Sequence, residues 1–127
     1  MRILLVDDYA PVMALTAAAL DDDAGHELDT ATDGRAALEK IASGSYDLVV
    51  MNLRLREVDG PECLSVIRKL RPNQKVLILA EAVDGAAASA LRASGIRPDA
   101  VLAGPRDRKT LSRRIGAMLR PFPPTLP

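Results

Sequence analysis

Four short segments of the chain consist almost entirely of apolar residues, at positions 3–6, 48–51, 76–79 and 100–103. Uninterrupted apolar runs of this length are typical of parallel strands that helices cover on both faces of a sheet. Residues 26–31 instead alternate polar and apolar side chains, which is typical of an edge strand with one face partly in water. The pattern therefore predicts five strands.

Apolar side chains with helical spacing occupy the segments between these strands. A stripe at i, i+3, i+4, i+7 and i+8 begins at Val12, a similar stripe spans residues 111–119, and shorter ones lie within 37–41, 63–70 and 87–91. Strands and helices thus alternate strictly, with short connections between them. Because right-handed crossovers place helices on both faces of a sheet, this alternation predicts a doubly wound α/β fold, a three-layer (βα)5 sandwich.

Residues 1–120 carry all of these elements and are predicted to form one domain. Residues 121–127 read Pro-Phe-Pro-Pro-Thr-Leu-Pro and are predicted to be a tail or linker, because proline cannot continue a helix. With 127 residues, 48% of them hydrophobic, the chain can bury a core without disulfides or metal. Cys63 is the only cysteine, which excludes an internal disulfide and fits a reducing cytosol.

Charge and hydropathy narrow the classes of partner. No apolar run reaches the ~18 residues of a membrane span, and a strand follows Met1 directly, so we expect a cytoplasmic protein without a membrane partner. The formal net charge is zero, but residues 1–60 hold 12 acids against 5 bases, whereas residues 92–127 hold 2 acids against 8 bases. The basic end favours an acidic protein surface as its target. Nucleic acid is disfavoured, because Phe122 is the only aromatic side chain there for bases to stack on.

Polar residues end two of the predicted strands. Asp7 and Asp8 follow the first apolar run, and Asn52 follows the third. In doubly wound sheets, ligands bind at the carboxyl ends of the strands, at the point where the strand order reverses. These three residues are therefore the candidate site.

The order of the motifs resembles that of bacterial response-regulator receiver domains, the signalling modules of two-component systems. The resemblance covers about residues 1–120 and rests on Asp7-Asp8 after Ile-Leu-Leu-Val, on Tyr46-Asp47 before the third strand, and on Asp33-Gly34, Asp59-Gly60 and Gly104-Pro105. It implies a flavodoxin-like parallel sheet in the order 2-1-3-4-5. In that family the acidic pair binds Mg²⁺ together with an aspartate that ends the third strand, and this aspartate accepts a phosphoryl group. A Thr or Ser ending strand four and a Lys ending strand five hold the phosphoryl oxygens.

The chain departs from this pattern at three positions. Asn52 stands in place of the acceptor aspartate, and an amide is a feeble nucleophile. Ala80 replaces the hydroxyl residue, and Gly104 replaces the lysine. We therefore interpret the chain as a degenerate pseudo-receiver without enzymatic activity. Three coincident losses favour natural degeneration over an engineered block at Asn52.

Two interpretations of the acidic pair stay open. Asp7, Asp8, the Asn52 side-chain carbonyl and a backbone carbonyl near Arg54 offer oxygen ligands to a weakly bound Mg²⁺ ion. Alternatively, Asp7 and Asp8 cap the first helix.

The family's usual dimer interface, around helix four, strand five and helix five, is altered as well. Arg114 matches an interface arginine, but Ala100 and Thr110 stand where the resemblance implies acidic partners, and Val101 replaces an aromatic residue that reports phosphorylation. A phosphorylation-driven dimer is thus doubtful. A constitutive interface would include basic residues of this region: Arg92, Arg106, Arg113 and Arg114.

The leading hypothesis is a module that acts by phosphorylation-independent protein binding, with a histidine kinase or an output domain as its partner. A second hypothesis is the regulatory receiver of a larger regulator or kinase in which engineering has replaced the acceptor. A third is a flavodoxin-like binder of a small ligand. The loop after the first strand argues against the third, because it presents two carboxylates and few donors to a phosphate.

Overall fold

The computed structural model describes residues 1–21, 25–80, 86–103 and 107–119, which form five strands and five helices in strict alternation. Their bounds are β1 Arg2–Val6, α1 Ala10–Asp21, β2 Glu27–Ala31, α2 Gly34–Ser43, β3 Leu48–Asn52, α3 Gly60–Leu70, β4 Val76–Ala80, α4 Ala86–Ser94, β5 Ala100–Ala103 and α5 Arg108–Leu119. Gly104, Arg106 and the predicted tail 121–127 lie outside the described residues. The proposed domain boundary at residue 120 therefore stays a prediction.

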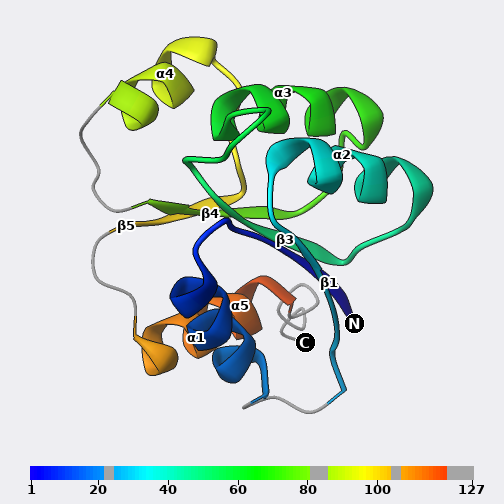
Figure 1. The fold of residues 1–127 in the computed structure, drawn as a ribbon, viewed down its shortest axis with the longest axis vertical. Coiled ribbons are helices and arrows are strands. Elements are labelled where there is room, and N and C mark those ends of the chain that lie inside the picture. Colours follow the sequence, from blue (N-terminus) through cyan, green and yellow to red (C-terminus); the bar gives the residue numbers. More distant parts are fainter. Residues whose placement is uncertain (22–24, 81–85, 104–106, 120–127) are drawn as a thin grey trace, which may run out of the picture.

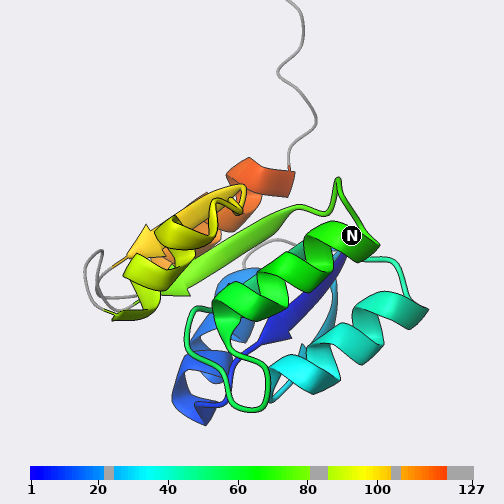
Figure 2. The same cartoon turned by 90° about the horizontal axis from the view of Figure 1, so that it is seen from above.

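All five strands are parallel, in the order β2-β1-β3-β4-β5. Helices α1 and α5 cover one face of the sheet, and α2, α3 and α4 cover the other (Figure 1). Seen from above, α2, α3 and α4 lie next to one another across their face (Figure 2). The predicted (βα)5 sandwich and its strand order are confirmed, and so is the edge position of the strand expected at 26–31.

The core is divided by the sheet into two layers. Alternate residues of each strand point to opposite faces, so that Leu4 and Met51 pack under α2, α3 and α4, whereas Leu5 and Val50 pack against α1 and α5. The central strands are buried at almost every position. This double burial is the reason that their sequences are continuous apolar runs.

Two glycines fix the loop between β3 and α3. A Cβ atom on Gly60 would lie 2.0 Å from the backbone oxygen of Leu53, and one on Gly34 would lie 2.0 Å from that of Val58. The amide of Gly60 donates to Leu53 O at 3.1 Å, and that of Gly34 donates to Arg56 O at 3.1 Å. The loop is therefore hydrogen-bonded to the starts of both α2 and α3.

In the described part of the chain, no helix has the length and apolar character needed to cross a membrane.

Replacing Gly60 by alanine should push the β3–α3 loop away from α3. We expect Gly60→Ala to lower the free energy of unfolding by about 2–4 kcal/mol, because backbone rather than a flexible side chain blocks the added methyl group. Urea denaturation measures the change. Gly44→Ala is the matched control, since its Cβ would lie 3.3 Å from the nearest atom, Lys40 O. Equal losses for the two variants would contradict this account of the loop.

The thiol of Cys63 should be inert while the protein is folded. Cys63 is fully buried in α3, and this burial raises the pKa of its thiol to about 12. Because only the thiolate reacts rapidly with alkylating agents, we expect no labelling by iodoacetamide at pH 8 and complete single labelling in urea. Intact mass spectrometry counts the label. Rapid labelling of the native protein would show that α3 opens far more readily than its packing indicates.

Candidate functional site

Asp7 and Asn52 meet at the carboxyl ends of the strands, and Asp8 follows Asp7 in the chain. Strands β1 and β3 are neighbours, and their register pairs Val6 with Met51. The residues that follow these two, Asp7 and Asn52, are thereby placed side by side. The structure thus brings together two of the three residues that the strand ends indicated, Asp7 and Asn52.

Asp7 is fully buried, and both of its carboxylate oxygens accept hydrogen bonds. Its Oδ1 accepts from the amide of Tyr9 at 2.9 Å, and its Oδ2 accepts from Nδ2 of Asn52 at 3.2 Å. Asn52 in turn accepts, at Oδ1, from the amide of Arg54 at 3.0 Å. The orientation of the Asn52 amide follows from these partners, because an N–H group faces its oxygen and a carboxylate faces its nitrogen.

Asp8 has a different environment. Its side chain is partly exposed, and its Oδ2 lies 3.6 Å from Nε of Arg56. No basic partner was predicted from the sequence for either carboxylate, and Arg56 was not among the candidate residues. The one signal in the sequence is that Arg56 lies four residues after Asn52, in the loop that follows the third strand.

The alternative interpretation, in which Asp7 and Asp8 cap α1, is supported only for Asp7 and only indirectly. The amides of Val12 and Met13, in the first turn, donate to the backbone oxygen of Tyr9. Asp7 accepts from the amide of Tyr9, one residue before the helix begins. Asp7 therefore stabilises the turn that leads into α1.

The same groups bear on the expected Mg²⁺ site at Asp7, Asp8, Asn52 and Arg54. The Asn52 side chain presents its NH₂ group to Asp7, and Arg56 presents its guanidinium to Asp8. Within the described ranges, no group of three or more His, Cys, Asp and Glu side chains is suited to a metal ion. As arranged, these residues do not fit Mg²⁺, because a hydrogen-bond donor or a cation faces each carboxylate.

Two further substituted positions among the described residues, Ala80 and Val101, lie on β4 and β5. Ala80 ends β4, is 4% exposed, and contributes only a methyl group beside the site. Val101, on the edge strand β5, is 41% exposed. The side chain of Arg114 reaches this strand from α5, and its Nη2 donates to Val101 O at 3.4 Å.

Three of the four predicted interface arginines lie on described helices, and Arg106 is outside the described residues. Arg92 is exposed on α4, and Arg113 and Arg114 are exposed on α5. The described residues thus place three of the four predicted arginines at the protein surface, two of them on the same helix.

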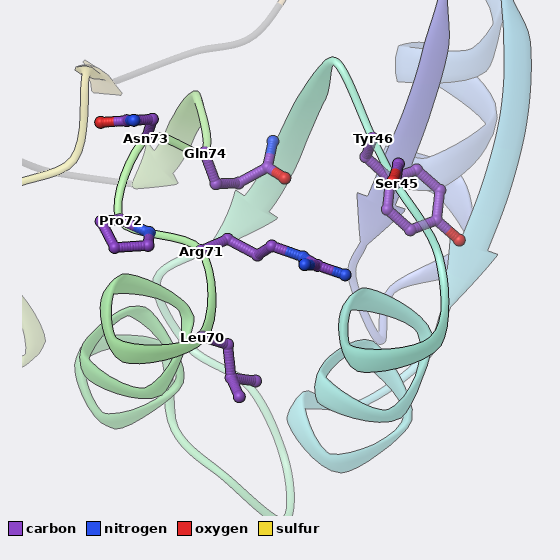
Figure 3. Close-up of a pocket in the computed structure, with 7 residues that line it drawn as sticks. All are labelled: Ser45, Tyr46, Leu70, Arg71, Pro72, Asn73 and Gln74. Carbon is purple, nitrogen blue, oxygen red and sulfur yellow. The ribbon is translucent and has the colours of Figure 1, made fainter.

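An open pocket of about 390 Å³ lies at the opposite edge of the sheet (Figure 3). It is lined by the segments that precede β3 and β4: Ser45, Tyr46, Leu70, Arg71, Pro72, Asn73 and Gln74. Arg71 extends across it and donates to Gly44 O at 3.2 Å, at the end of α2. This pocket is separate from the candidate site, because it opens at the amino ends of the strands.

Comparison with known proteins agrees with this geometry. The model of the response regulator receiver domain family matches residues 3–115. The transcriptional regulatory protein TcrA of Mycobacterium tuberculosis is 35% identical over an aligned length of 130, gaps included, which covers 99% of this chain and 50% of TcrA. The chemotaxis protein CheY of Thermotoga maritima is 35% identical over 78 residues, 61% of this chain and 64% of that protein. This chain thus spans about half the length of TcrA.

Solved structures are similar as well. A CheY-like receiver domain protein from Methanospirillum hungatei superposes with a TM-score of 0.80 at 26% identity, over 93% of this chain and 92% of that one. The response regulator TrrA from Thermotoga maritima, solved in complex with Mg²⁺ and BeF, has a TM-score of 0.76 at 30% identity, over 93% and 98% of the two chains. Receiver domains typically bind Mg²⁺ at the phosphorylation site.

The two aspartates should contribute unequally to stability. Asp7→Ala leaves the NH₂ group of the partly buried Asn52 and the amide of Tyr9 without their acceptor, so we expect it to cost about 1–3 kcal/mol. Asp8→Ala removes only a partly exposed ion pair and should cost less than about 1 kcal/mol. Urea denaturation of both variants at neutral pH provides the comparison. A larger loss for Asp8→Ala would contradict the roles assigned to the pair.

Proposed function

Because this chain belongs to the response regulator receiver domain family of two-component signalling, we propose that it is a pseudo-receiver that acts by binding proteins without accepting a phosphoryl group. The observation that carries this proposal is the hydrogen bond from Asn52 Nδ2 to Asp7. In this chain an amide group therefore stands at the position from which the carboxylate of a typical family member attacks the phosphoryl donor.

Phosphoryl transfer needs a nucleophile and groups that stabilise the transferred oxygens. The Asn52 nitrogen is delocalised into the amide and donates to Asp7, and its oxygen accepts from the Arg54 amide. Ala80 supplies no hydroxyl group to a phosphoryl oxygen. The substitution at Gly104, which lies outside the described residues, removes the family's cation and supports the same conclusion.

A protein partner suits the surface that remains. Receiver domains act with kinases and output domains of two-component systems, and this chain matches about half of TcrA. The exposed Val101, together with Arg92, Arg113 and Arg114, favours an acidic partner or a constitutive dimer. Arg106, the fourth predicted interface residue, lies outside the described residues. We propose a cytoplasmic role as one domain, residues 1–120, of a longer regulator.

The two other hypotheses have less support. Engineering of Asn52 alone does not account for Ala80, whose substitution is a further loss at the same site. A small-ligand function needs a cavity at the carboxyl edge of the sheet. The pocket bounded by Tyr46 and Arg71 lies at the amino edge, so it does not supply one.

Exposure to a phosphoryl donor tests the proposal directly. We expect the intact mass to stay unchanged after incubation with acetyl phosphate and Mg²⁺, because no carboxylate stands at position 52. A receiver domain with its acceptor aspartate serves as the positive control. A phosphoryl adduct that hydroxylamine removes would overturn the proposal.

The variant Asn52→Asp separates natural degeneration from engineering. With Ala80 and Gly104 still in place, we expect at most slow phosphorylation of this variant and no accompanying change in its amide NMR spectrum. Rapid phosphorylation with a conformational response from this single change would support the engineered alternative instead.

A further inference from the structure

We propose that Asn52 and Arg56 together take the place of a divalent cation, so that the site keeps its two carboxylates without Mg²⁺ and does not bind this ion at millimolar concentration. The proposal concerns the metal and not the phosphoryl group. It therefore stands or falls separately from the function proposed above.

The first step is the compensation of Asp7. A fully buried carboxylate is stable only if donors or cations replace its lost water. Here the amide of Tyr9 and the NH₂ group of Asn52 donate to its two oxygens at 2.9 and 3.2 Å. The charge of Asp7 is thus already stabilised by the protein itself.

The second step is the cost of admitting a metal at Asp7. For its side-chain oxygen to face a shared ion, Asn52 would have to turn its amide over. The NH₂ group would then meet the amide of Arg54, which now donates to Asn52 Oδ1 at 3.0 Å. Two donors would face each other, and one of them would lose its partner.

The third step concerns Asp8. Its carboxylate lies 3.6 Å from the Arg56 guanidinium, and the backbone of Arg56 is held where the Gly34 amide donates to its oxygen. This ion pair is largely exposed, so it adds little to stability. The ion pair instead weakens metal binding. A divalent cation bound at Asp8 would lie close to the positive charge of Arg56, and the two would repel each other.

The balance of charge leads to the same conclusion. Asp7 and Asp8 contribute two negative charges, Arg56 contributes one positive charge and Asn52 none, which leaves a net charge of −1. An aspartate at position 52 without the arginine would leave −3. Bound Mg²⁺ would bring that hypothetical site to −1, the value that this chain reaches without metal. Asn52 and Arg56 thus supply the same change in charge as the ion.

Titration with magnesium chloride tests the inference on the intact chain. Amide chemical shifts of residues 7–9 and 52–56 report binding, and replacement of Mg²⁺ by Mn²⁺ gives a second readout through local line broadening. The variants are Arg56→Ala, Asn52→Asp and the two combined. Arg54→Ala is the matched control, because it removes an exposed arginine from the same loop and leaves the Asp8 contact intact.

For the unaltered chain we expect no saturable response to Mg²⁺. The variant Asn52→Asp should gain saturable binding, and adding Arg56→Ala should tighten it about fivefold, whereas adding Arg54→Ala should change it by less than about twofold. Saturation of the unaltered chain at low millimolar Mg²⁺ would overturn the inference, even if the variants failed to fold. If Arg56→Ala and Arg54→Ala changed the Mg²⁺ affinity of the Asn52→Asp variant equally, the role proposed for Arg56 would be wrong.

Discussion

Every strand of this sheet except those at its edges is buried on both faces, and this double burial determines where polar chemistry can lie. A charged side chain at an interior position of β1, β3 or β4 would point into one of the two apolar layers. Polar groups are therefore confined to the strand ends, where the backbone leaves the sheet. The meeting of Asp7 with Asn52 follows from this constraint together with the order β2-β1-β3-β4-β5, which makes β1 and β3 neighbours.

A buried carboxylate at such a strand end must be compensated, and a sheet of this kind offers two means of doing so. One is a bound cation, which adds charge but leaves with dilution. The other is a set of donors built into the chain, as the amides of Tyr9 and Asn52 are for Asp7. Built-in donors compensate the charge continuously, and they connect the loop after β1 to the end of β3 without any ligand. The compensation of Asp7 therefore does not depend on the concentration of a metal ion.

The sequence predicted the fold more completely than it predicted the site. Continuous apolar runs identify β1, β3 and β4 because both faces of each strand are buried, and the alternation at 26–31 identifies β2 because one face of an edge strand is wet. The proximity of Asp7 to Asn52 followed from strand order alone. The Arg56–Asp8 contact did not, because it depends on the path of a loop in which Glu57 adopts a φ of 66° and Arg56 O meets the start of α2. The path of such a loop cannot be predicted from hydrophobic periodicity, because no repeating pattern of residues determines it.

The separation of core from strand ends also bears on the proposed loss of phosphoryl chemistry, because the fold and the site depend on different residues. The two apolar layers contain neither Asp7 nor Asn52, and Ala80 contributes a methyl group to one of them. Alanine in place of a hydroxyl residue at that strand end therefore leaves the core closed. Exchange of aspartate for asparagine at the end of β3 replaces a repulsive neighbour of Asp7 by a donor. At positions 52 and 80, the substitutions that the proposed function interprets as losses of chemistry are thus compatible with a stable receiver fold.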